Sequence, residues 1–594
     1  MKRRFMTAAL AGLIVAVSGC APVDEAQTSA YSESTAQEQT TQEQTTQEIT
    51  VPEETTAAQK EASWDVTGDE VWFSAPSGFY GKSLSVAMTT NEIEGEIHYT
   101  TDGSTPTAAS PLYTSEIVID AGRNEFPPCV CIRAVVIDSS GKAGEESVHV
   151  YFVDTGIGDR FDTYVFTVFG DYEDVYGDTG FLNPENSHNR GLESERKVYV
   201  AAFTPEGEQV LGQFCGARVY GGASRDASLK SIKLFARKTY DADKGSFNAN
   251  LFDTPGYDGK SISKYKKLVL RNAGNDFQFA YLRDELSHTL ALQAGFADYE
   301  AVRPVVGYVN GAYYCFYWLH ENYCDDYFKA RYGKAAGEFV VLEGNDRKKY
   351  DPNMQEDEQQ FYDEYNSMYD SFKDADLTDD EEYERLCSVL DVENYLDYFA
   401  FNIYICNADW PENNIKVYRY YPAKGEEPGE GVFDGRWRHL LHDMDYTYGM
   451  YDQSKVMANY DNLANILKKG KNKYSPLFAG LMQRSDCKLY FANKMAQLMS
   501  TTLSHKNILQ TLDDVDALRS AEMVHYYKYL ADLRNKGDDS IWTRSNHLEN
   551  YMQQIRNFSL MRPVYMIRYI EKDLGVTIVE NDGVYTVAEN TGEE

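Results

Sequence analysis

The residues of this sequence best suited to chemistry are spaced carboxylates and an amide in the second half of the chain. Asp409 and Asn414 lie in one polar stretch, and Asp443 and Asp445 lie in the segment His-Asp-Met-Asp. Carboxylate and amide oxygens are hard ligands that suit Mg²⁺ or Mn²⁺. The chemistry they indicate is metal-assisted, but Asp and Asn are also ordinary loop residues, so their spacing alone is a weak signal.

The elements around these residues have to bring them to one point. Residues 390–405 predict a helix, because apolar side chains recur on one side of it. Pro411 and the neighbouring Asn residues break that helix, so the stretch 409–414 is expected on a loop. Two strands at 415–420 and 436–441 follow, joined by a polar Gly-rich loop, and Asp443 comes after the second strand.

A helix, an Asp-x4-Asn loop, a hairpin and a further Asp occur in this order in the catalytic lobe of protein kinases. There the first Asp orients or deprotonates the acceptor hydroxyl, and the Asn and the later Asp hold the metal ions. The sequence contains no Gly-x-Ser-x-Gly elbow, His-Glu-x-x-His motif or Gly-x-x-x-x-Gly-Lys-Ser/Thr loop. The acidic stretch 374–385 fails as a calcium loop, because its sixth and twelfth positions are Asp379 and Arg385.

Several short segments occur in a fixed order along the chain. They are Tyr-Gly-Gly-Ala-Ser-Arg at 220–225 with Leu-Lys-Ser-Ile-Lys-Leu at 229–234, Leu-Arg-Asn-Ala-Gly-Asn-Asp at 270–276 with Arg-Asp at 283–284, Val-Asn-Gly at 309–311 with Leu-His-Glu at 319–321, Asp-Trp-Pro-Glu-Asn-Asn at 409–414 and Asp-Met-Asp at 443–445. Together they resemble the CotH-type spore-coat kinases, a kinase-like group distant from eukaryotic kinases. The resemblance implies a two-lobed, α+β, atypical protein-kinase-like domain with a helical C-terminal part, which binds ATP with Mg²⁺ or Mn²⁺.

The resemblance assigns the chemistry residue by residue. Asp409 matches the catalytic base or acceptor-positioning residue. Asn414 and Asp443 match the metal ligands, and Asp445 is the alternate ligand.

The resemblance also assigns residues to the nucleotide phosphates. Lys230 matches the Lys expected to contact them, on the strand face that would roof the cleft, and a simple surface Lys is the alternative. Lys233, on the opposite strand face, is the weaker candidate. Gly222 and Ser224, with Arg225 beside them, match a short turn that approaches phosphate through its backbone amides.

Three further residues are expected around the cleft by the same resemblance. Glu321 would lie at the hinge near the adenine, against the alternative of an exposed carboxylate at a strand end. Arg283 and Asp284 would brace the cleft, against the alternative of a pair on a helix surface.

The beginning of the chain predicts export. A basic start at residues 2–4 and an apolar run at 5–17 form a signal peptide, too short to span a membrane. Its end, Val-Ser-Gly-Cys, resembles the bacterial lipobox, which implies cleavage before Cys20 and acylation of its thiol; a plain signal peptide is the alternative. We expect a lipid anchor on the outer side of the cell membrane, and a disordered Thr/Gln/Glu-rich tether at 21–61.

Residues 66–154 predict a small β module. Short alternating runs separated by turns are typical of an antiparallel, fibronectin-like sandwich. The segment Tyr-Thr-Thr-Asp-Gly-Ser-Thr-Pro at 99–106 resembles the C-terminal module of chitobiases and β-hexosaminidases. We expect a spacer that folds on its own and is dispensable for chemistry, with glycan binding as the alternative.

Composition excludes some functions. The 57 Lys and Arg against 93 Asp and Glu give a net charge of −36, which argues against nucleic acid as a partner. The hydrophobic share of 43% allows a large core. Eight cysteines follow Cys20, and their wide spacing predicts buried free thiols rather than a disulfide framework.

The sequence thus predicts an exported, lipid-anchored atypical kinase that transfers the γ-phosphoryl group of ATP to Ser or Thr of a surface or coat protein. A non-catalytic kinase-like surface scaffold or adhesion protein, binding protein or glycan, is the alternative. The expected division is a signal peptide at 1–20, the tether at 21–61, the β module at 66–154, a kinase-like domain at 158–575 with its lobes meeting at about 320, and a tail at 576–594.

Overall fold

The structure is a computed structural model of the chain. It describes residues 71–91, 95–333, 335–343, 356–452, 454–468, 475–535 and 545–588, which belong to one compact unit. The expected signal peptide, Cys20 and the tether lie outside the described residues. No helix within the described ranges is long and apolar enough to cross a membrane.

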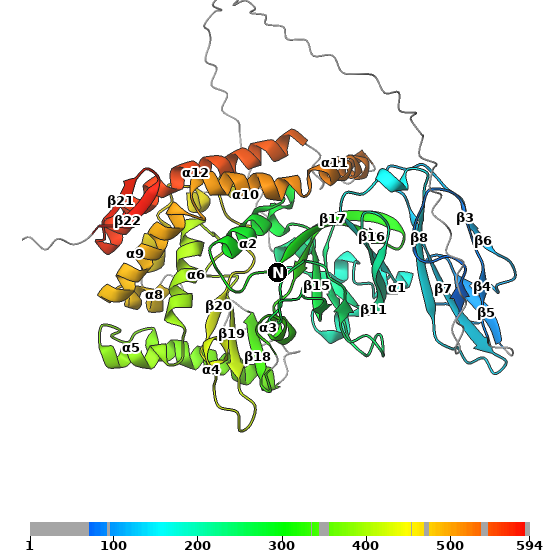
Figure 1. The fold of residues 1–594 in the computed structure, drawn as a ribbon, viewed down its shortest axis with the longest axis horizontal. Coiled ribbons are helices and arrows are strands. Elements are labelled where there is room, and N and C mark those ends of the chain that lie inside the picture. The colour runs from blue at the N-terminus through cyan, green and yellow to red at the C-terminus, as the bar shows by residue number, and fades with distance from the viewer. Residues whose placement is uncertain are drawn as a thin grey trace, which may run out of the picture. The chain divides into compact units, whose positions relative to one another are not determined.

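The N-terminal part is a β-rich module (Figure 1). Its main sheet contains four strands in the order β2 (Gly78–Tyr80), β8 (Ser147–Val153), β7 (Cys129–Asp138) and β5 (Gly95–Thr100). Two short pairs complete it, β3 (Leu84–Val86) with β6 (Ile117–Ile119) and β1 (Trp72–Phe73) with β4 (Met88–Thr89). The sheet is mixed rather than antiparallel throughout, because β2 and β8 run in the same direction and pair in parallel.

The main sheet of the module buries an apolar cluster of its own on only one of its two faces. One face buries a separate apolar cluster, but Phe152 on the other face belongs to the core of the following domain. Its ring meets that of Tyr308 edge to face, with the centroids 5.0 Å apart. The amide of Cys129 also donates a hydrogen bond to the Gly311 carbonyl, at 3.0 Å. Apolar area is therefore shared between the two parts, which argues against a spacer that folds on its own, and its dispensability for chemistry stays a prediction.

A closed barrel follows the module, and α2 (Arg283–Gln293) follows one of its strands. Strand alternation points Ile232, Leu234 and Leu270 into the barrel, whereas Lys233 and Arg271 lie on its outer surface. The strands, in spatial order, are β10 (Arg196–Phe203), β11 (Gln209–Tyr220), β12 (Ser231–Phe235), β15 (Lys267–Arg271), β17 (Ala312–Glu321), β16 (Val302–Val309) and β9 (Tyr164–Phe169).

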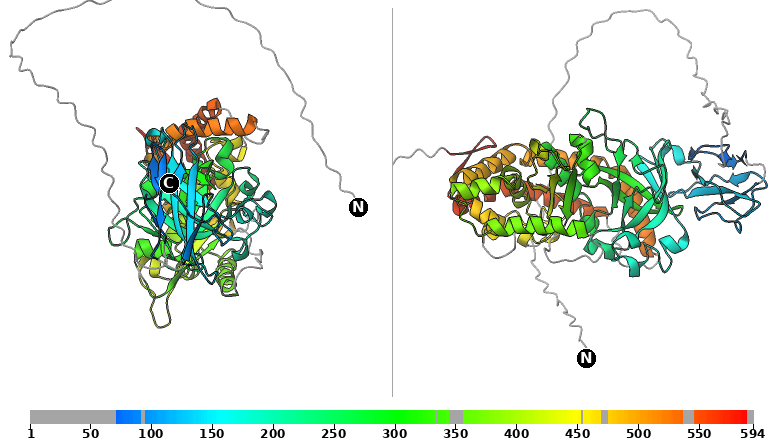
Figure 2. Two further views of the ribbon diagram at one scale, coloured as in Figure 1. Left: turned by 90° about the vertical axis from the view of Figure 1, so that its right-hand side faces the viewer. Right: turned by 90° about the horizontal axis from the view of Figure 1, so that it is seen from below.

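The C-terminal region is mainly helical and includes one antiparallel sheet, β18 (Glu338–Glu343), β19 (Lys416–Tyr421) and β20 (Arg438–Leu440). In colour its helices run from green at α3 to orange-red at α12 (Figures 1 and 2). They are α3 (Asp325–Tyr332), α4 (Glu356–Phe372), α5 (Asp380–Cys387), α6 (Val392–Tyr404), α7 (Asn462–Leu467), α8 (Ser475–Leu481), α9 (Ser485–Ser500), α10 (His505–Ala517), α11 (Ser520–Asn535) and α12 (Ser545–Leu574).

Three local expectations are confirmed here. The predicted helix at 390–405 is α6, which begins where the Asp391 side chain accepts a hydrogen bond from the Asn394 amide, and the predicted hairpin is β19 with β20. The eight cysteines of the described residues are all free, and most are buried. The last described segment forms a hairpin, β21 (Ile578–Asn581) and β22 (Val584–Val587), and Tyr585 of β22 hydrogen-bonds with Ser500 of α9.

Candidate functional site

The loop between α6 and β19 brings two of the predicted residues together. Asp409 is half-buried, and one oxygen of its carboxylate accepts a hydrogen bond from the Asn413 side chain, at 2.8 Å. Asn414 has a φ of +62°, a left-handed conformation that Asn adopts more readily than most residues. Its amide nitrogen lies 3.3 Å from the other Asp409 oxygen and 3.2 Å from the main-chain oxygen of Asp443. Asn414 therefore links the two aspartates.

Asp443 and Asp445 differ in how open they are. The Asp443 side chain is 27% exposed, and one of its oxygens accepts a hydrogen bond from Arg271. The Asp445 side chain is only 1% exposed and accepts hydrogen bonds from Arg271 at 2.9 Å and from the Asn275 amide at 2.7 Å. Burial and the nearby Asp443 charge raise the pKa of Asp445 well above its usual range. Asp443 is thus the ligand candidate that a metal ion can reach, and protein groups already occupy Asp445.

Arg271 connects the barrel to this loop. It ends β15, and its Nε lies 3.2 Å from a carboxylate oxygen of Asp284. The other Asp284 oxygen accepts a hydrogen bond from the Met444 amide, at 2.6 Å. Gly274 allows the close approach, because a Cβ there would lie 2.1 Å from an Asp445 oxygen and 2.6 Å from an Arg271 nitrogen.

Arg283 and Asp284 both brace this region from the first turn of α2. Their side chains are 0% and 2% exposed, so the alternative of a pair on a helix surface is wrong. Asp284 holds the Met444 backbone as described, and Arg283 forms an ion pair with Asp276 in the turn that precedes the helix. Asp276 also accepts a hydrogen bond from the Arg283 amide, at 2.9 Å.

The residues present fit a divalent cation. Asn414 uses its amide nitrogen for the two contacts above, and its side-chain oxygen accepts no hydrogen bond from any described residue. The second carboxylate oxygen of Asp443 likewise has no donor within the described ranges. Open carboxylate and amide oxygens are donors of the kind that Mg²⁺ and Mn²⁺ take.

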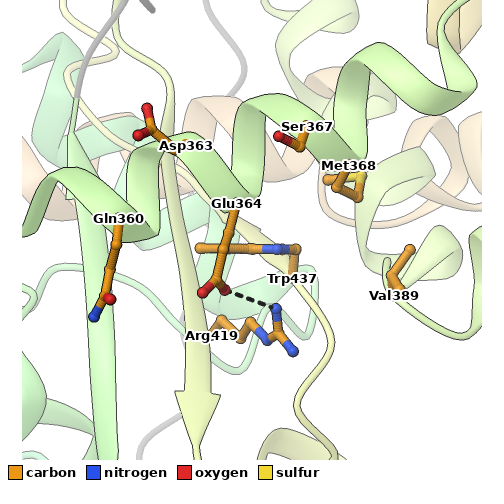
Figure 3. Close-up of a pocket in the computed structure, with 8 residues that line it drawn as sticks. All are labelled: Gln360, Asp363, Glu364, Ser367, Met368, Val389, Arg419 and Trp437. Atoms are coloured by element: carbon orange, nitrogen blue, oxygen red, sulfur yellow. Dashed lines mark hydrogen bonds and ion pairs between the residues drawn. The ribbon is translucent and has the colours of Figure 1, made fainter.

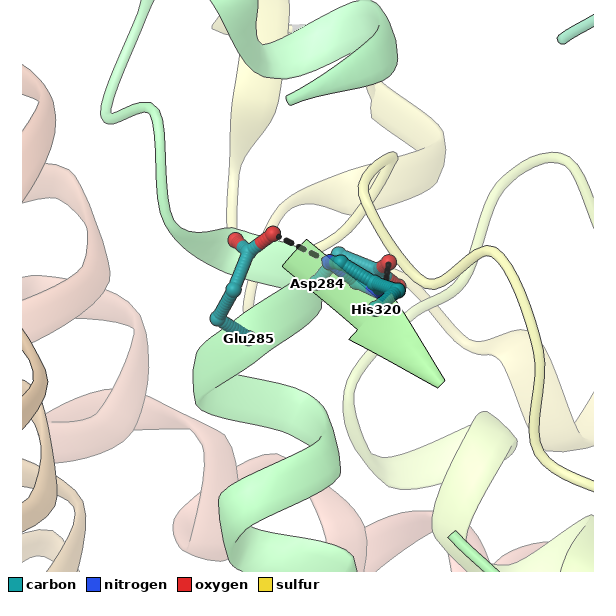
Figure 4. A group of neighbouring side chains, drawn as sticks. All are labelled: Asp284, Glu285 and His320. Carbon is teal, nitrogen blue, oxygen red and sulfur yellow. Dashed lines mark hydrogen bonds and ion pairs between the residues drawn. The ribbon is translucent and has the colours of Figure 1, made fainter. Parts of the chain in front are cut away.

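A second acidic cluster lies deeper and is less suited to a metal ion (Figure 4). Asp284, Glu285 and His320 offer ligand atoms within 4.8 Å of one another, and all three are buried. However, Glu285 already hydrogen-bonds to His320, at 2.9 Å. Burial opposes the charged form of His320, yet its hydrogen bonds to Glu285 and Glu300 raise its pKa to about 9. In the absence of a metal ion the cluster is thus a buried ion-pair network, and a cation would have to displace the imidazole proton to bind there.

The position of Lys230 differs from the prediction. Lys230 precedes β12, and its ammonium group donates hydrogen bonds to the carbonyls of Arg225 at 2.7 Å and Ala227 at 3.2 Å. The strand face it would share with Ile232 points into the barrel, not toward the carboxylates. Sequence alternation gives the two faces of a strand but not which one the barrel encloses.

Lys233 lies on the outer face of the same strand, where the prediction placed only the weaker candidate. Burial lowers its pKa to about 7, and the nearby Lys267 and Lys416 act in the same direction. Lys416, at the start of β19, forms an ion pair with Glu343 at 3.3 Å. Lys233 therefore faces the region that also contains the β19 residues following Asn414.

The predicted phosphate turn contains a short helix at Ala223–Asp226. The Arg225 side chain donates hydrogen bonds to the carbonyls of Gly221 and Ser187, both at 2.6 Å, so it supports the turn. Gly222 precedes the helix, and Ser224 lines a cavity of about 300 Å³. The cavity also reaches the segment 272–278 and the side chains of Tyr451, Tyr526 and Leu530.

Glu321 ends β17 next to the described start of the helical region, but its carboxylate is not open. Arg331 of α3 donates two hydrogen bonds to it, at 2.8 and 2.5 Å. Its side chain also points to the opposite strand face from that of His320. The alternative of an exposed carboxylate at a strand end is wrong, because the Glu321 side chain is 3% exposed and paired. Its position at the hinge near the adenine stays a prediction.

Sequence reasoning missed Arg271 and Asn275, although both lie in the segment 270–276 that carried the resemblance. A charged residue at the end of an apolar strand, followed by Asn and Asp, was the available signal. The contact partners of Arg271 lie up to 174 positions away, so the sequence does not identify them.

A further hollow of about 440 Å³ lies between α4 and the β19–β20 sheet (Figure 3). Glu364 of α4 and Arg419 of β19 face each other across it, 3.5 Å apart, beside the ring of Trp437. None of the residues predicted for the site lines this hollow.

Comparison with known proteins agrees with these observations. No curated protein matches the chain. The chitobiase/beta-hexosaminidase C-terminal domain family matches residues 75–148, within the β module. The CotH kinase protein family matches residues 217–566, which cover more than half of the chain and include Asp409, Asn414 and Asp443. This chain therefore belongs to the CotH kinase protein family.

Proposed function

We propose that this protein is an exported, lipid-anchored atypical kinase that transfers the γ-phosphoryl group of ATP to Ser or Thr hydroxyls of a surface or coat protein. Membership of the CotH kinase protein family supports a kinase-like protein. The observation that carries the proposal is that Asn414 hydrogen-bonds to both Asp409 and Asp443, which joins the three residues at one half-exposed point. A scaffold without catalysis has no need for such a set.

The barrel and the helical region would form the two lobes around this point. Asp409, whose carboxylate is held by Asn413 and Asn414, would accept or orient the proton of the acceptor hydroxyl. Asn414 and Asp443 would hold Mg²⁺ or Mn²⁺, which when bound neutralises charge on the transferring phosphoryl group. Catalysis would therefore rest on positioning and charge rather than on a covalent enzyme intermediate.

The anchor and the location belong to the same proposal. The lipobox at residues 17–20 supports acylation of Cys20, and the polar stretch 21–61 would give the domain reach from the membrane. ATP with Mg²⁺ or Mn²⁺ and an unidentified protein acceptor are the implied partners, and glycan binding by the β module is the remaining candidate interaction.

The proposal is tested by incubating the purified protein with a surface-protein extract and ATP labelled at either the γ- or the α-phosphate, with Mg²⁺, with Mn²⁺ or with a chelator. Metal-dependent transfer of the γ-label to Ser or Thr supports it. Transfer of the α-label instead indicates nucleotidyl transfer. Absence of both transfer and nucleotide binding contradicts the kinase proposal and favours the non-catalytic scaffold.

A further inference from the structure

We propose that Arg271 is the cationic residue that contacts the nucleotide phosphates, a task that the sequence resemblance gave to Lys230. This inference rests on the proposed function, because it needs a nucleotide at the Asp443 site. It assigns a residue that no comparison identifies and places the phosphates at the end of β15.

Lys230 is poorly placed for the task. Its ammonium group is 2.7 Å from the carbonyl of Arg225 and 3.2 Å from that of Ala227. Its backbone is also fixed, since its amide donates to the Tyr314 hydroxyl and its carbonyl accepts from the Tyr317 hydroxyl. A contact with phosphate would require Lys230 to leave both carbonyls.

Arg271 is held next to the metal-ligand candidate by three carboxylates. Nε pairs with Asp284, and Nη2 bonds to both Asp443 and Asp445. The third nitrogen, Nη1, has no partner among the residues that the structure describes. The guanidinium is thus fixed in orientation, and Nη1 is available to donate hydrogen bonds to a ligand.

This geometry suits phosphate. The planar fork of an arginine binds phosphate oxygens with charge-assisted hydrogen bonds, and a fixed side chain loses little entropy when it does so. Because Arg271 touches Asp443, an oxygen near Nη1 would also be near a cation on Asp443. A phosphate group could then contact both Arg271 and this cation. Arg271 already neutralises buried carboxylates, so the positive charge of the cation would offset the added negative charge of the phosphate.

Lys233 is the main competitor on the same outer face of the barrel. It lies opposite Val269 of β15, two positions before Arg271. Its ammonium group is surrounded by Lys267, Lys416 and Arg218 as well as by Glu343, so it is one cation among several. Unlike Arg271, it forms no ion pair within the described ranges that fixes its orientation toward Asp443.

The test compares the affinities of ATP and adenosine, measured by calorimetry with Mg²⁺ for the full-length protein and its variants. Arg271→Lys keeps the positive charge but cannot contact Asp284, Asp443 and a ligand at once. We expect it to weaken ATP binding by about tenfold or more, the cost of one lost charge-assisted hydrogen bond, while adenosine binding changes less than about twofold. A role in folding alone would weaken both ligands equally. A role only in holding Asp443 would weaken ATP binding when Mg²⁺ is present and leave it unchanged without metal, so the same titrations are repeated without Mg²⁺.

The matched control is Arg303→Lys, which changes an arginine of β16, separated from β15 by β17 in the barrel, that pairs with exposed Asp253. It should leave both affinities unchanged. An unchanged ATP-to-adenosine ratio in Arg271→Lys, or a ratio that changes in Lys230→Met instead, overturns the inference and leaves the proposed function standing. Wild-type protein that binds neither ligand overturns the proposed function and this inference with it.

Discussion

Replacing Asp443 by Asn separates a metal ligand from a structural carboxylate. The side chain keeps its size, and Asn tolerates the φ of +52° found at this position. The lost interaction is one charge-assisted hydrogen bond to Arg271, which retains Asp284 and Asp445 as partners. Removing the Asp443 charge also removes its repulsion of the buried Asp445 carboxylate. We therefore expect a loss of about 1 kcal/mol or less in the free energy of unfolding.

The effect on metal binding should be much larger. A neutral amide lacks the charge that attracts a divalent cation, so the apparent Kd of Mn²⁺ in the presence of an ATP analogue should rise by about tenfold or more. Electron paramagnetic resonance of free Mn²⁺ measures this Kd, and chemical denaturation measures the stability of the same samples.

Asp434→Asn is the matched control on the same hairpin. Its carboxylate pairs with Arg436 and Arg438, both at 2.7 Å, so the change should lower stability without altering Mn²⁺ affinity. If Asp443→Asn instead lost several kcal/mol of stability and bound Mn²⁺ like the wild type, the interpretation of Asp443 as a ligand would be refuted.

Three further predictions concern other parts of the chain. Phe152→Ala should cost about 3–5 kcal/mol in denaturation experiments, because the ring is buried against the barrel; a cost below about 1 kcal/mol would show that the module is independent after all. The raised pKa of His320 stabilises the fold fully below about pH 6.5, and this contribution is lost as the pH rises toward 9. The difference in free energy of unfolding between wild type and His320→Gln should therefore shrink by about 3 kcal/mol between about pH 6.5 and 9. A constant difference would contradict the charged network. Cys20→Ala should release the protein from the membrane fraction, and unchanged partitioning would contradict the lipid anchor.

The parts of the site that depend on local sequence were predictable. Apolar periodicity gave the helix α6, and Pro411 and the Asn residues gave the loop that carries Asp409 and Asn414. The hairpin that follows brings Asp443 back to Asn414, so three candidates converge as the order of elements suggested.

The parts that depend on closure of the barrel were not predictable from local pattern. Strand alternation separates Lys230 from Lys233, but only the closed barrel decides that Lys233 and Arg271 face outward. The same limit applies to Glu321, whose carboxylate is taken by Arg331 of a later helix. The β module and the barrel also share a buried apolar contact between Phe152 and Tyr308. These residues are far apart along the chain, so the sequence does not predict their contact.

Phosphoryl transfer by an Asp409→Asn variant shows whether the chemistry takes place at Asp409. Asn keeps the hydrogen bonds that Asp409 can accept through one oxygen but cannot take a proton or attract one as a carboxylate does. We expect the variant still to bind ATP with Mg²⁺ and to keep its melting temperature within about 2 °C, whereas transfer of the γ-label should fall by about a hundredfold or more. Transfer at the wild-type rate by this variant would show that the chemistry does not take place at the Asp409–Asn414–Asp443 site.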